Sequence, residues 1–171
     1  GQVDEASQNL LKAFQHREAL VSKNPKIARF RRHLAVTCMK LGQLNETLDK
    51  NADAIDFYRK AVKHWQTGVN DETSNTGHRL AYADACRRLG DVLRVAKGAS
   101  PAVEWYSKSI QMLDDVLANQ PQHAVAAALI TTLHESQAAA LTELGRYREA
   151  VAELDRALLR VTEANRDRIR I

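Results

Sequence analysis

The chain repeats itself along its whole length: a shift of 48 residues aligns the sequence with itself without a gap. Aligned positions keep a small, aromatic, aliphatic or basic character from unit to unit. The clearest columns hold Ala6, Ala54, Ala102 and Ala150; Leu10, Tyr58, Tyr106 and Leu154; and Phe14, Val62, Ile110 and Leu158. A period of this length predicts a stack of similar units, each of which packs mainly against its neighbours.

Two apolar patterns of helical spacing occur in each unit. Ile55, Tyr58 and Val62 are three or four residues apart, which places them on one face of a helix that we call helix B. An earlier pattern, which includes Leu34 and Leu41, predicts a preceding helix A. Only 7 Gly, 3 Pro and 5% aromatic residues among 171 leave few breaks and argue against a sandwich or barrel. We therefore expect an all-α fold, an α-α superhelix of about seven antiparallel helices.

The period also divides the chain into units. It places a lone helix B at 3–24 and three full units at 25–72, 73–120 and 121–168, within one domain that spans 1–171. Because stacked repeats bury their faces against neighbours, a first helix B without a helix A leaves an open edge. We therefore expect the chain to be a piece of a larger protein.

Residues typical of helix ends lie at the unit boundaries and agree with this division. Asn24-Pro25 and Ser100-Pro101 have the pattern of a capping residue before a first-turn proline. Gly98 and Gly145 lie where helix A is expected to end. The polar run 69–77 is the longest predicted loop.

A more specific pattern recurs at the junction of the two helices. A Leu-Gly pair in helix A is followed at fixed distances by an alanine, an aromatic residue and a small residue. The first unit has Leu41-Gly42, Ala54, Tyr58 and Ala61, and the second has Leu89-Gly90, Ala102, Tyr106 and Ser109. The third unit departs from it, with Gln137-Ala138 in place of Leu-Gly, but continues with Leu144-Gly145-Arg146-Tyr147 and Ala150.

This column pattern resembles the tetratricopeptide repeat (TPR) family. The family consensus is about 34 residues long, whereas the unit here has 48. Lengthening both helices by about two turns would keep the facing stripes nearly in register. Units this long resemble the TPR regions attached to bacterial Ser/Thr protein kinases of the planctomycete type. The resemblance implies a scaffold that binds a peptide or protein segment on a concave surface formed by the A helices.

Motifs that carry chemistry are missing from the sequence. It contains no Gly-rich phosphate loop, HExxH, CxxC or GxSxG, so we expect no enzyme activity and no cofactor or metal. Cys38, Cys86 and His134 share one column of helix A, and we interpret them as fillers of a half-buried structural position rather than metal ligands. No stretch has the length of a spanning helix or a signal peptide. With only two cysteines, the chain fits a cytoplasmic setting.

The resemblance also implies which side chains meet a partner, namely those of helix A that lie opposite its core stripe. They are Val36, Met39, Gln43 and Glu46; Asp84, Arg87, Asp91 and Arg94; and Thr132, Glu135, Ala139 and Thr142. Residues 26–49 and 76–99 each carry five Lys or Arg against two acids, while 122–145 carry none against two. We therefore expect a protein or peptide partner of acidic or phosphorylated character, unless these charges form only a solvated face.

Two other functions stay open at this point. A sequence pI of about 9.2 and the paired arginines Arg31-Arg32 and Arg87-Arg88 suggest a basic solenoid that binds nucleic acid or another polyanion, although a net charge of +4 is modest for that role. The open repeat ends suggest a spacer or self-association element of a larger signalling protein, which would form a homo-oligomer through those ends.

Overall fold

The structure, a computed structural model, describes the backbone of residues 2–169 and the side chains of residues 5–160. Within that range the chain forms helices and no strand. In chain order they are α1 (Gln2–Lys23), α2 (Ala28–Thr47), α3 (Asn51–Asp71), α4 (Thr76–Lys97), α5 (Ala99–Asn119), α6 (Ala124–Glu143) and α7 (Tyr147–Ile169). The expected all-α fold of seven helices is confirmed.

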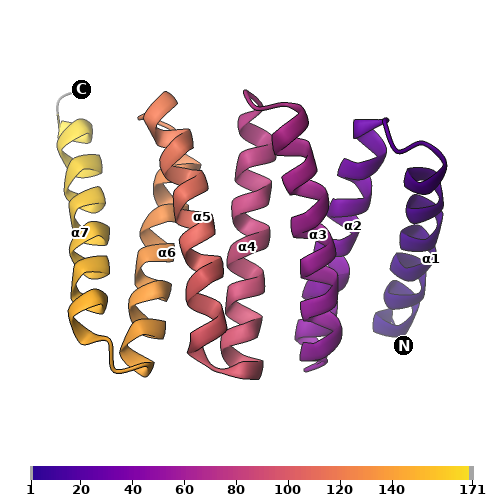
Figure 1. Ribbon diagram of the computed structural model, residues 1–171, viewed down its shortest axis with the longest axis horizontal. Coiled ribbons are helices and arrows are strands. Elements are labelled where there is room, and N and C mark those ends of the chain that lie inside the picture. Colours follow the sequence, from indigo (N-terminus) through magenta and orange to yellow (C-terminus); the bar gives the residue numbers. More distant parts are fainter. Residues whose placement is uncertain (1, 170–171) are drawn as a thin grey trace.

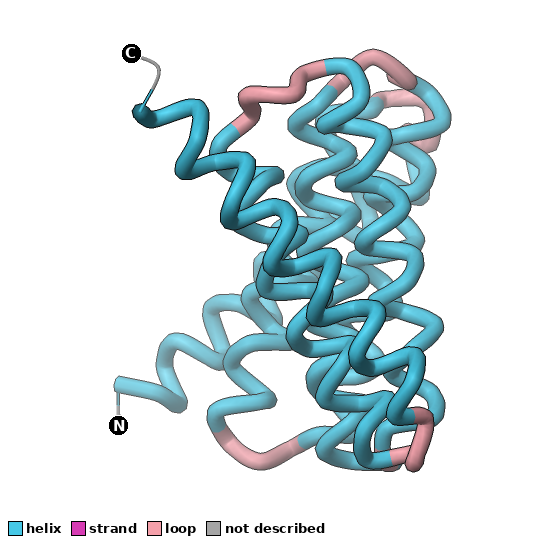
Figure 2. Tube along the Cα trace, turned by 90° about the vertical axis from the view of Figure 1, so that its left-hand side faces the viewer, coloured by secondary structure: helices cyan, strands magenta, loops and turns pink. Residues whose placement is uncertain are grey.

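The helices stand side by side in chain order, and successive helices run in opposite directions (Figure 1). Each helix packs against the helix before it and the helix after it, and α4 also approaches α6. Seen from the side, the ends of α1 and α7 that carry the two termini project toward the same side of the stack (Figure 2). The A helices of the repeat are α2, α4 and α6, and the B helices are α1, α3, α5 and α7.

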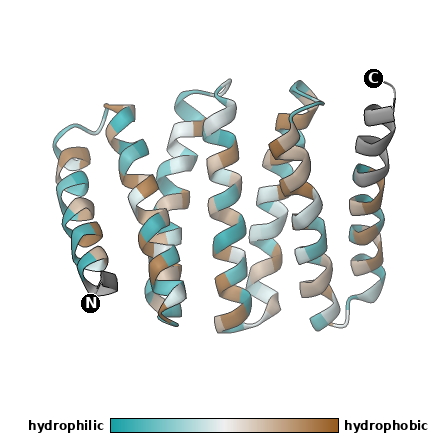
Figure 3. Cartoon of the chain, turned by 180° about the vertical axis from the view of Figure 1, so that it is seen from behind, coloured by the Kyte–Doolittle hydropathy of each residue, from teal (hydrophilic) through white to brown (hydrophobic). Residues whose placement is uncertain are grey.

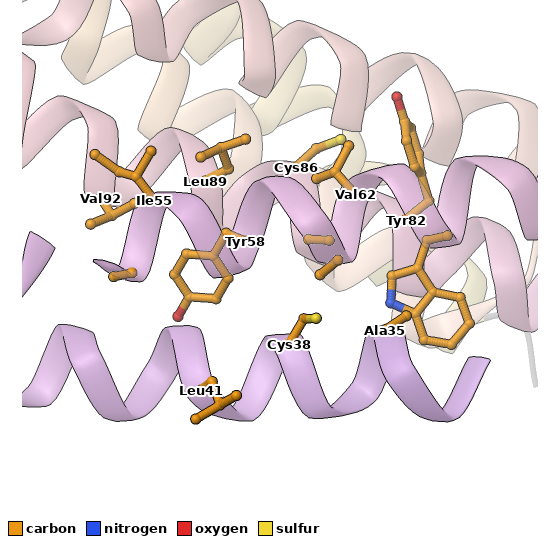
Figure 4. Close-up of a cluster of buried hydrophobic side chains, with 14 of the residues drawn as sticks. Ala35, Cys38, Leu41, Ile55, Tyr58, Val62, Tyr82, Cys86, Leu89 and Val92 are labelled. Atoms are coloured by element: carbon orange, nitrogen blue, oxygen red, sulfur yellow. The ribbon is translucent and has the colours of Figure 1, made fainter. Parts of the chain in front are cut away.

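The core runs through the stack, with one buried cluster that joins α1 to α4 and a second that joins α4 to α6. Within it, the first two hairpins each pack a tyrosine of helix B on helix A. The ring of Tyr58 on α3 is fully buried and lies against α2 with its hydroxyl turned toward that helix (Figure 4). A Cβ atom added at Gly42 would come within 2.5 Å of the Tyr58 ring, and one at Gly90 within 2.7 Å of Tyr106. The two mid-helix glycines are therefore where a tyrosine ring packs directly on the backbone of helix A.

Two of the predicted boundaries are wrong in detail. The run 69–77 is not a long loop: α3 continues to Asp71 because Val69 packs in the core, and α4 begins at Thr76, which leaves only residues 72–75 between them. Asn75 caps α4, since its side chain accepts a hydrogen bond from the His78 backbone N–H at 3.1 Å.

The predicted caps at the prolines are wrong as well, whereas the glycine stops are confirmed. Ile27 rather than Asn24 is the N-cap of α2, and Gly98 rather than Ser100 is the N-cap of α5. Gly98 and Gly145 have φ values of 84° and 71°, so both take the left-handed backbone that ends a helix at low cost only for glycine.

The last B helix has an apolar side that its counterparts bury. Val151 on α7 is 57% exposed, whereas Ile55, the matching residue on α3, is 3% exposed. Leu154 and Leu158 are likewise exposed on α7. Viewed from behind, apolar and polar stretches alternate along the helices (Figure 3). Among the described residues, no helix combines the length and apolar character needed to cross a membrane.

Candidate partner-binding face

The outward surface of α2, α4 and α6 contains all the side chains predicted to meet a partner, and we call it the helix A face. Its exposed members are Val36, Thr132, Glu135, Ala139 and Thr142, and its half-buried members are Met39, Gln43, Glu46, Asp84, Arg87, Asp91 and Arg94. None of these residues is buried in the core. All of them therefore lie at the surface, and their contact with a partner stays a prediction.

The centre of this face is a set of ion pairs along α4. Arg87 lies between two carboxylates of its own helix and donates to Asp84 and to Asp91, both at 2.8 Å. Spacings of three and four residues bring these side chains onto one helical face. Arg87 is therefore held in one position by two carboxylates rather than free to extend into solvent.

Two core tyrosines anchor the carboxylates from below. The Tyr106 hydroxyl on α5 donates to Asp91 at 2.8 Å, and the Tyr58 hydroxyl on α3 donates to Glu46 at 2.7 Å. Burial raises the pKa of each tyrosine hydroxyl well above its ordinary value, and the adjacent carboxylate raises that pKa further. Each tyrosine thus fills the space beside a helix A glycine with its ring and positions a surface carboxylate with its hydroxyl.

Electrostatic effects link this set across the A helices. Burial acts to lower the pKa of Arg87, but the hydrogen bond to Asp84 and the charges of Asp84, Asp91 and Glu46 outweigh it, so the net shift is upward. Burial raises the pKa of Asp91, against the hydrogen bond from Tyr106 and the nearby arginines. Glu46 on α2 therefore acts on groups of α4.

On the other side, Arg94 of α4 lies 3.7 Å from Glu143 of α6. Arg88 approaches Asp84 at 4.0 Å. We call the connected residues the helix A charge network; its members are Glu46, Asp84, Arg87, Arg88, Asp91, Arg94 and Glu143. With three positive and four negative groups, the network is close to electrically balanced.

This balance was not foreseen from the charge counts along the sequence. The counts place basic residues on α4 but do not show that Arg87 is paired with Asp84 and Asp91. Their spacing of three and four residues was the available signal. The sequence interpretation also assigned Tyr58 and Tyr106 to the core alone, although a buried tyrosine hydroxyl usually needs a hydrogen-bond partner. Glu143, on α6, was not singled out at all.

The column shared by two cysteines and a histidine is more deeply buried than expected. Cys38 and Cys86 are fully buried and unpaired, and His134 is 3% exposed. Burial raises the pKa of both thiols to about 12, which keeps them protonated at neutral pH. Within the part of the chain that the structure describes, no group of three or more His, Cys, Asp or Glu residues could hold a metal ion.

With this geometry established, the chain can be compared with known proteins. Residues 35–63 match the tetratricopeptide repeat family. That segment holds the end of α2 and the start of α3, including Gly42, Ala54 and Tyr58, which carry the family pattern. No curated protein sequence matches the chain.

Solved structures of similar arrangement share little sequence with this chain. The crystal structure of MamA is 17% identical with a TM-score of 0.39, and covers 95% of this chain and 94% of its own. A crystal structure of MamA protein is 16% identical with a TM-score of 0.39, and the match covers 95% of this chain and 96% of that one. The crystal structure of BtubC (BKLC) from P. vanneervenii is 12% identical with a TM-score of 0.33, and the match covers 96% of this chain and 93% of that one. Since every TM-score is below 0.5, these likenesses do not bear on function.

Proposed function

We propose that this chain is a non-catalytic protein-interaction scaffold that binds a peptide or protein segment on the helix A face. The helix A charge network supports this proposal most directly. Its side chains reach from α2 across α4 to α6, remain partly exposed, and are held in place by hydrogen bonds from buried tyrosines. Polar groups that are already ordered lose little conformational entropy when a partner binds.

Apolar and polar features of this face suit a segment with both kinds of side chain. Val36 is exposed on α2, and Met39, one turn further along, is half-buried. On the neighbouring helix α4, the half-buried Asp84, Arg87 and Asp91 supply charged groups to the same face. An extended or helical segment could place an apolar anchor on α2 and hydrogen-bond acceptors on α4.

An acidic preference is part of this proposal, but it rests on fewer residues than the charge counts suggested. Arg87 already has two carboxylate partners, so a ligand carboxylate has to compete with Asp84 and Asp91 for it. Arg94, at 3.7 Å from an exposed Glu143, and the exposed Lys40 are more available. We expect an acidic residue of the partner to contact these two rather than Arg87.

We also propose that the repeat is a long variety of the TPR hairpin with a 48-residue period. In support, α2, α4 and α6 begin at Ala28, Thr76 and Ala124, and α3, α5 and α7 begin at Asn51, Ala99 and Tyr147. The same proposal includes attachment of this chain to a protein kinase and a cytoplasmic location. The free thiols of Cys38 and Cys86 are compatible with a cytoplasmic location.

A test of the scaffold proposal is selection of a random-peptide display library on the folded chain. The selection is repeated on Lys40→Glu with Arg94→Glu, which reverses the two available positive charges of this surface, and on Arg59→Glu with Lys63→Glu, which makes the same charge change at exposed positions of α3. We expect sequences that are enriched on the unmodified chain and on the α3 variant but lost on the variant with Lys40→Glu and Arg94→Glu. Enrichment that is equal on all three proteins, or absent from all, would count against the proposal.

Self-association is a second candidate, favoured by the exposed apolar side of α7. Val151 and Leu158 are 57% and 62% exposed, although the residues that match them on α3, Ile55 and Val62, are buried. Burying such a side against a second copy would remove apolar area from water. Light scattering over a range of concentrations should then show a dimer that Val151→Glu with Leu158→Glu converts to a monomer; a monomer at every concentration would exclude it.

A further inference from the structure

The third hairpin carries buried polar side chains at three positions where the other two have apolar ones. Where the first two hairpins have cysteine, leucine and an aromatic residue, the third has His134, Gln137 and Glu153. The matching residues are Cys38 and Cys86, Leu41 and Leu89, and Phe57 and Trp105. Because the first two hairpins fold with apolar residues there, the repeat itself does not require polar groups at these positions. All three replacements occur in one hairpin, on the facing helices α6 and α7.

Two of the three residues form a buried pair. The Nδ1 atom of His134 lies 2.7 Å from Oε2 of Glu153, and both side chains are more than nine-tenths buried. Arg156 donates to the other carboxylate oxygen, Oε1, at 2.5 Å. Glu153 thus holds the ring with the proton on Nδ1, and in the neutral ring Nε2 is then an acceptor. Within the described part of the chain Nε2 makes no hydrogen bond.

The third residue has an unused acceptor. Gln137 is 8% exposed, and its Nε2 atom donates to the Ser107 hydroxyl at 3.2 Å. Its Oε1 atom is buried and has no hydrogen-bond partner among the described residues. A buried carbonyl oxygen without a partner is costly in a folded protein, so one that persists calls for an explanation. Leucine, found here in the other two hairpins, would avoid the cost.

These groups line a cleft between α5 and α7, with α6 as its floor. The cleft consists of two adjoining hollows of about 420 and 270 Å³ that share Ile110, Asp114 and Arg156. His134 lines the larger hollow, and Gln137 and Glu153 line the smaller one. None of these residues belongs to the helix A face, so this cleft is separate from the proposed partner site.

The charges and apolar residues of the cleft define what it suits. Among the described residues that line it, three carboxylates, Asp114, Asp115 and Glu153, stand against two guanidinium groups, Arg156 and Arg160, which leaves one negative charge in excess. Ile110 and Leu159 add apolar surface beside the polar groups. Arg160 donates to Asp114 at 2.8 Å, and Arg156 donates to Glu153. Both guanidinium groups therefore already have a carboxylate partner, and the cleft is poorly suited to an anion.

We propose that this cleft binds an alkylammonium group. The ammonium donates hydrogen bonds to His134 Nε2 and, once the Gln137 amide turns toward the cleft, to its Oε1; the excess carboxylate charge balances it, while its alkyl chain packs on Ile110 and Leu159. A free amine and a lysine side chain of another protein share this chemistry. The third hairpin would thereby carry a recognition site that the first two hairpins lack.

The experiment is a titration of the ¹⁵N-labelled chain with n-butylammonium chloride at constant ionic strength. We expect saturable shifts at residues 107–115, 134–137 and 153–160 at millimolar concentrations. Tetramethylammonium, which has the same charge but no N–H donor, should give no saturable shift, and butyrate none. Equal effects of the two cations, binding of butyrate in place of butylammonium, or no saturable shift with any of them would overturn the proposal.

Repeat-matched variants identify the group responsible. Gln137→Leu restores the residue of the other hairpins and should weaken butylammonium binding about tenfold or more through loss of a charge-assisted hydrogen bond. Gln15→Leu makes the same change at an exposed position of α1, outside the cleft and the helix A face, and should leave binding unchanged. Undiminished binding by Gln137→Leu would contradict the assigned contact. Because the comparison of the two cations uses the unmodified chain, the proposal is tested even where a variant folds poorly.

Two further titrations distinguish the sources of the ammonium. A capped peptide with a single lysine is compared with the same peptide carrying Nε-acetyl-lysine, which lacks the charge. Binding of the lysine peptide at lower concentration than butylammonium assigns the cleft to a protein side chain, and the reverse order assigns it to a free amine. Binding of the acetylated peptide as tightly as the unmodified one would refute recognition of the ammonium.

Discussion

Replacing Gly42 by alanine tests the tyrosine-on-glycine packing that defines the first two hairpins. Alanine is the better helix former by about 1 kcal/mol, so propensity alone predicts a more stable protein. The structure predicts the opposite, since the added Cβ would lie 2.5 Å from the ring of Tyr58, which is fully buried. Forcing an extra methyl group into a packed core costs about 1–3 kcal/mol.

The hydroxyl of the same tyrosine adds to this cost. If the ring moves away from α2, its hydrogen bond to Glu46 at 2.7 Å lengthens, and a bond of this kind contributes about 1 kcal/mol. We therefore expect Gly42→Ala to lower the free energy of unfolding by about 2 kcal/mol after the gain in propensity. Urea denaturation followed by circular dichroism measures this difference.

A double-mutant cycle with Tyr58→Leu isolates the contact. In the Tyr58→Leu background the ring is gone, so Gly42→Ala should be neutral or stabilising by up to about 1 kcal/mol. The third hairpin has this combination naturally, with Ala138 and Leu154 in the matching positions. The same cycle in the second hairpin, with Gly90→Ala and Tyr106→Leu, should give the same pattern, because a Cβ added at Gly90 comes within 2.7 Å of the Tyr106 ring. An unchanged effect of Gly42→Ala in both backgrounds would refute the packing argument.

Three other perturbations have equally definite outcomes. Gln137→Leu should raise the free energy of unfolding by about 1 kcal/mol in urea denaturation, because removing a buried carbonyl oxygen that has no partner among the described residues outweighs the lost hydrogen bond to Ser107; a loss of stability would show that the amide has a structural role. Asn75→Ala should lower it by about 1 kcal/mol through loss of the α4 cap, and Asn75→Ser, which keeps an acceptor without bringing a second carboxylate beside Glu72, should not. Burial holds the pKa of Cys38 and Cys86 at about 12; unfolded thiols lose their protons at lower pH, so stability should decline as pH rises above about 9, and Cys38→Ala with Cys86→Ala should make the decline shallower.

The repeat explains why so much of the fold could be predicted. The apolar spacing of helix B occurs four times and that of helix A three times. The helices could therefore be recognised from this repeated spacing, and the prediction did not depend on helix propensity alone. Helix ends were predicted less well, because they depend on local capping. Asn24-Pro25 looks like a cap, but the helix begins after Ile27, and residues 69–77 look like a loop although Val69 is held by the core.

The candidate sites depend on contacts between helices, which the sequence shows only indirectly. The outward phase of Arg87 and Asp91 follows from helical spacing, but the hydrogen bond from Tyr106 joins residues 15 apart in the chain. Likewise, the replacement of Leu by Gln at 137 was visible as a departure from the family pattern. Its proximity to Glu153 on α7 became apparent only when the helices were placed against each other.

The central claim is that a protein segment binds across the helix A face, and an NMR footprint tests it most directly. The ¹⁵N-labelled chain is titrated with a peptide enriched in the display selection, and the backbone shifts are mapped. Our account predicts that the largest shifts lie at residues 36–46 of α2, 84–94 of α4 and 132–142 of α6. Shifts confined to α3 and α5, or to the exposed side of α7, would contradict it.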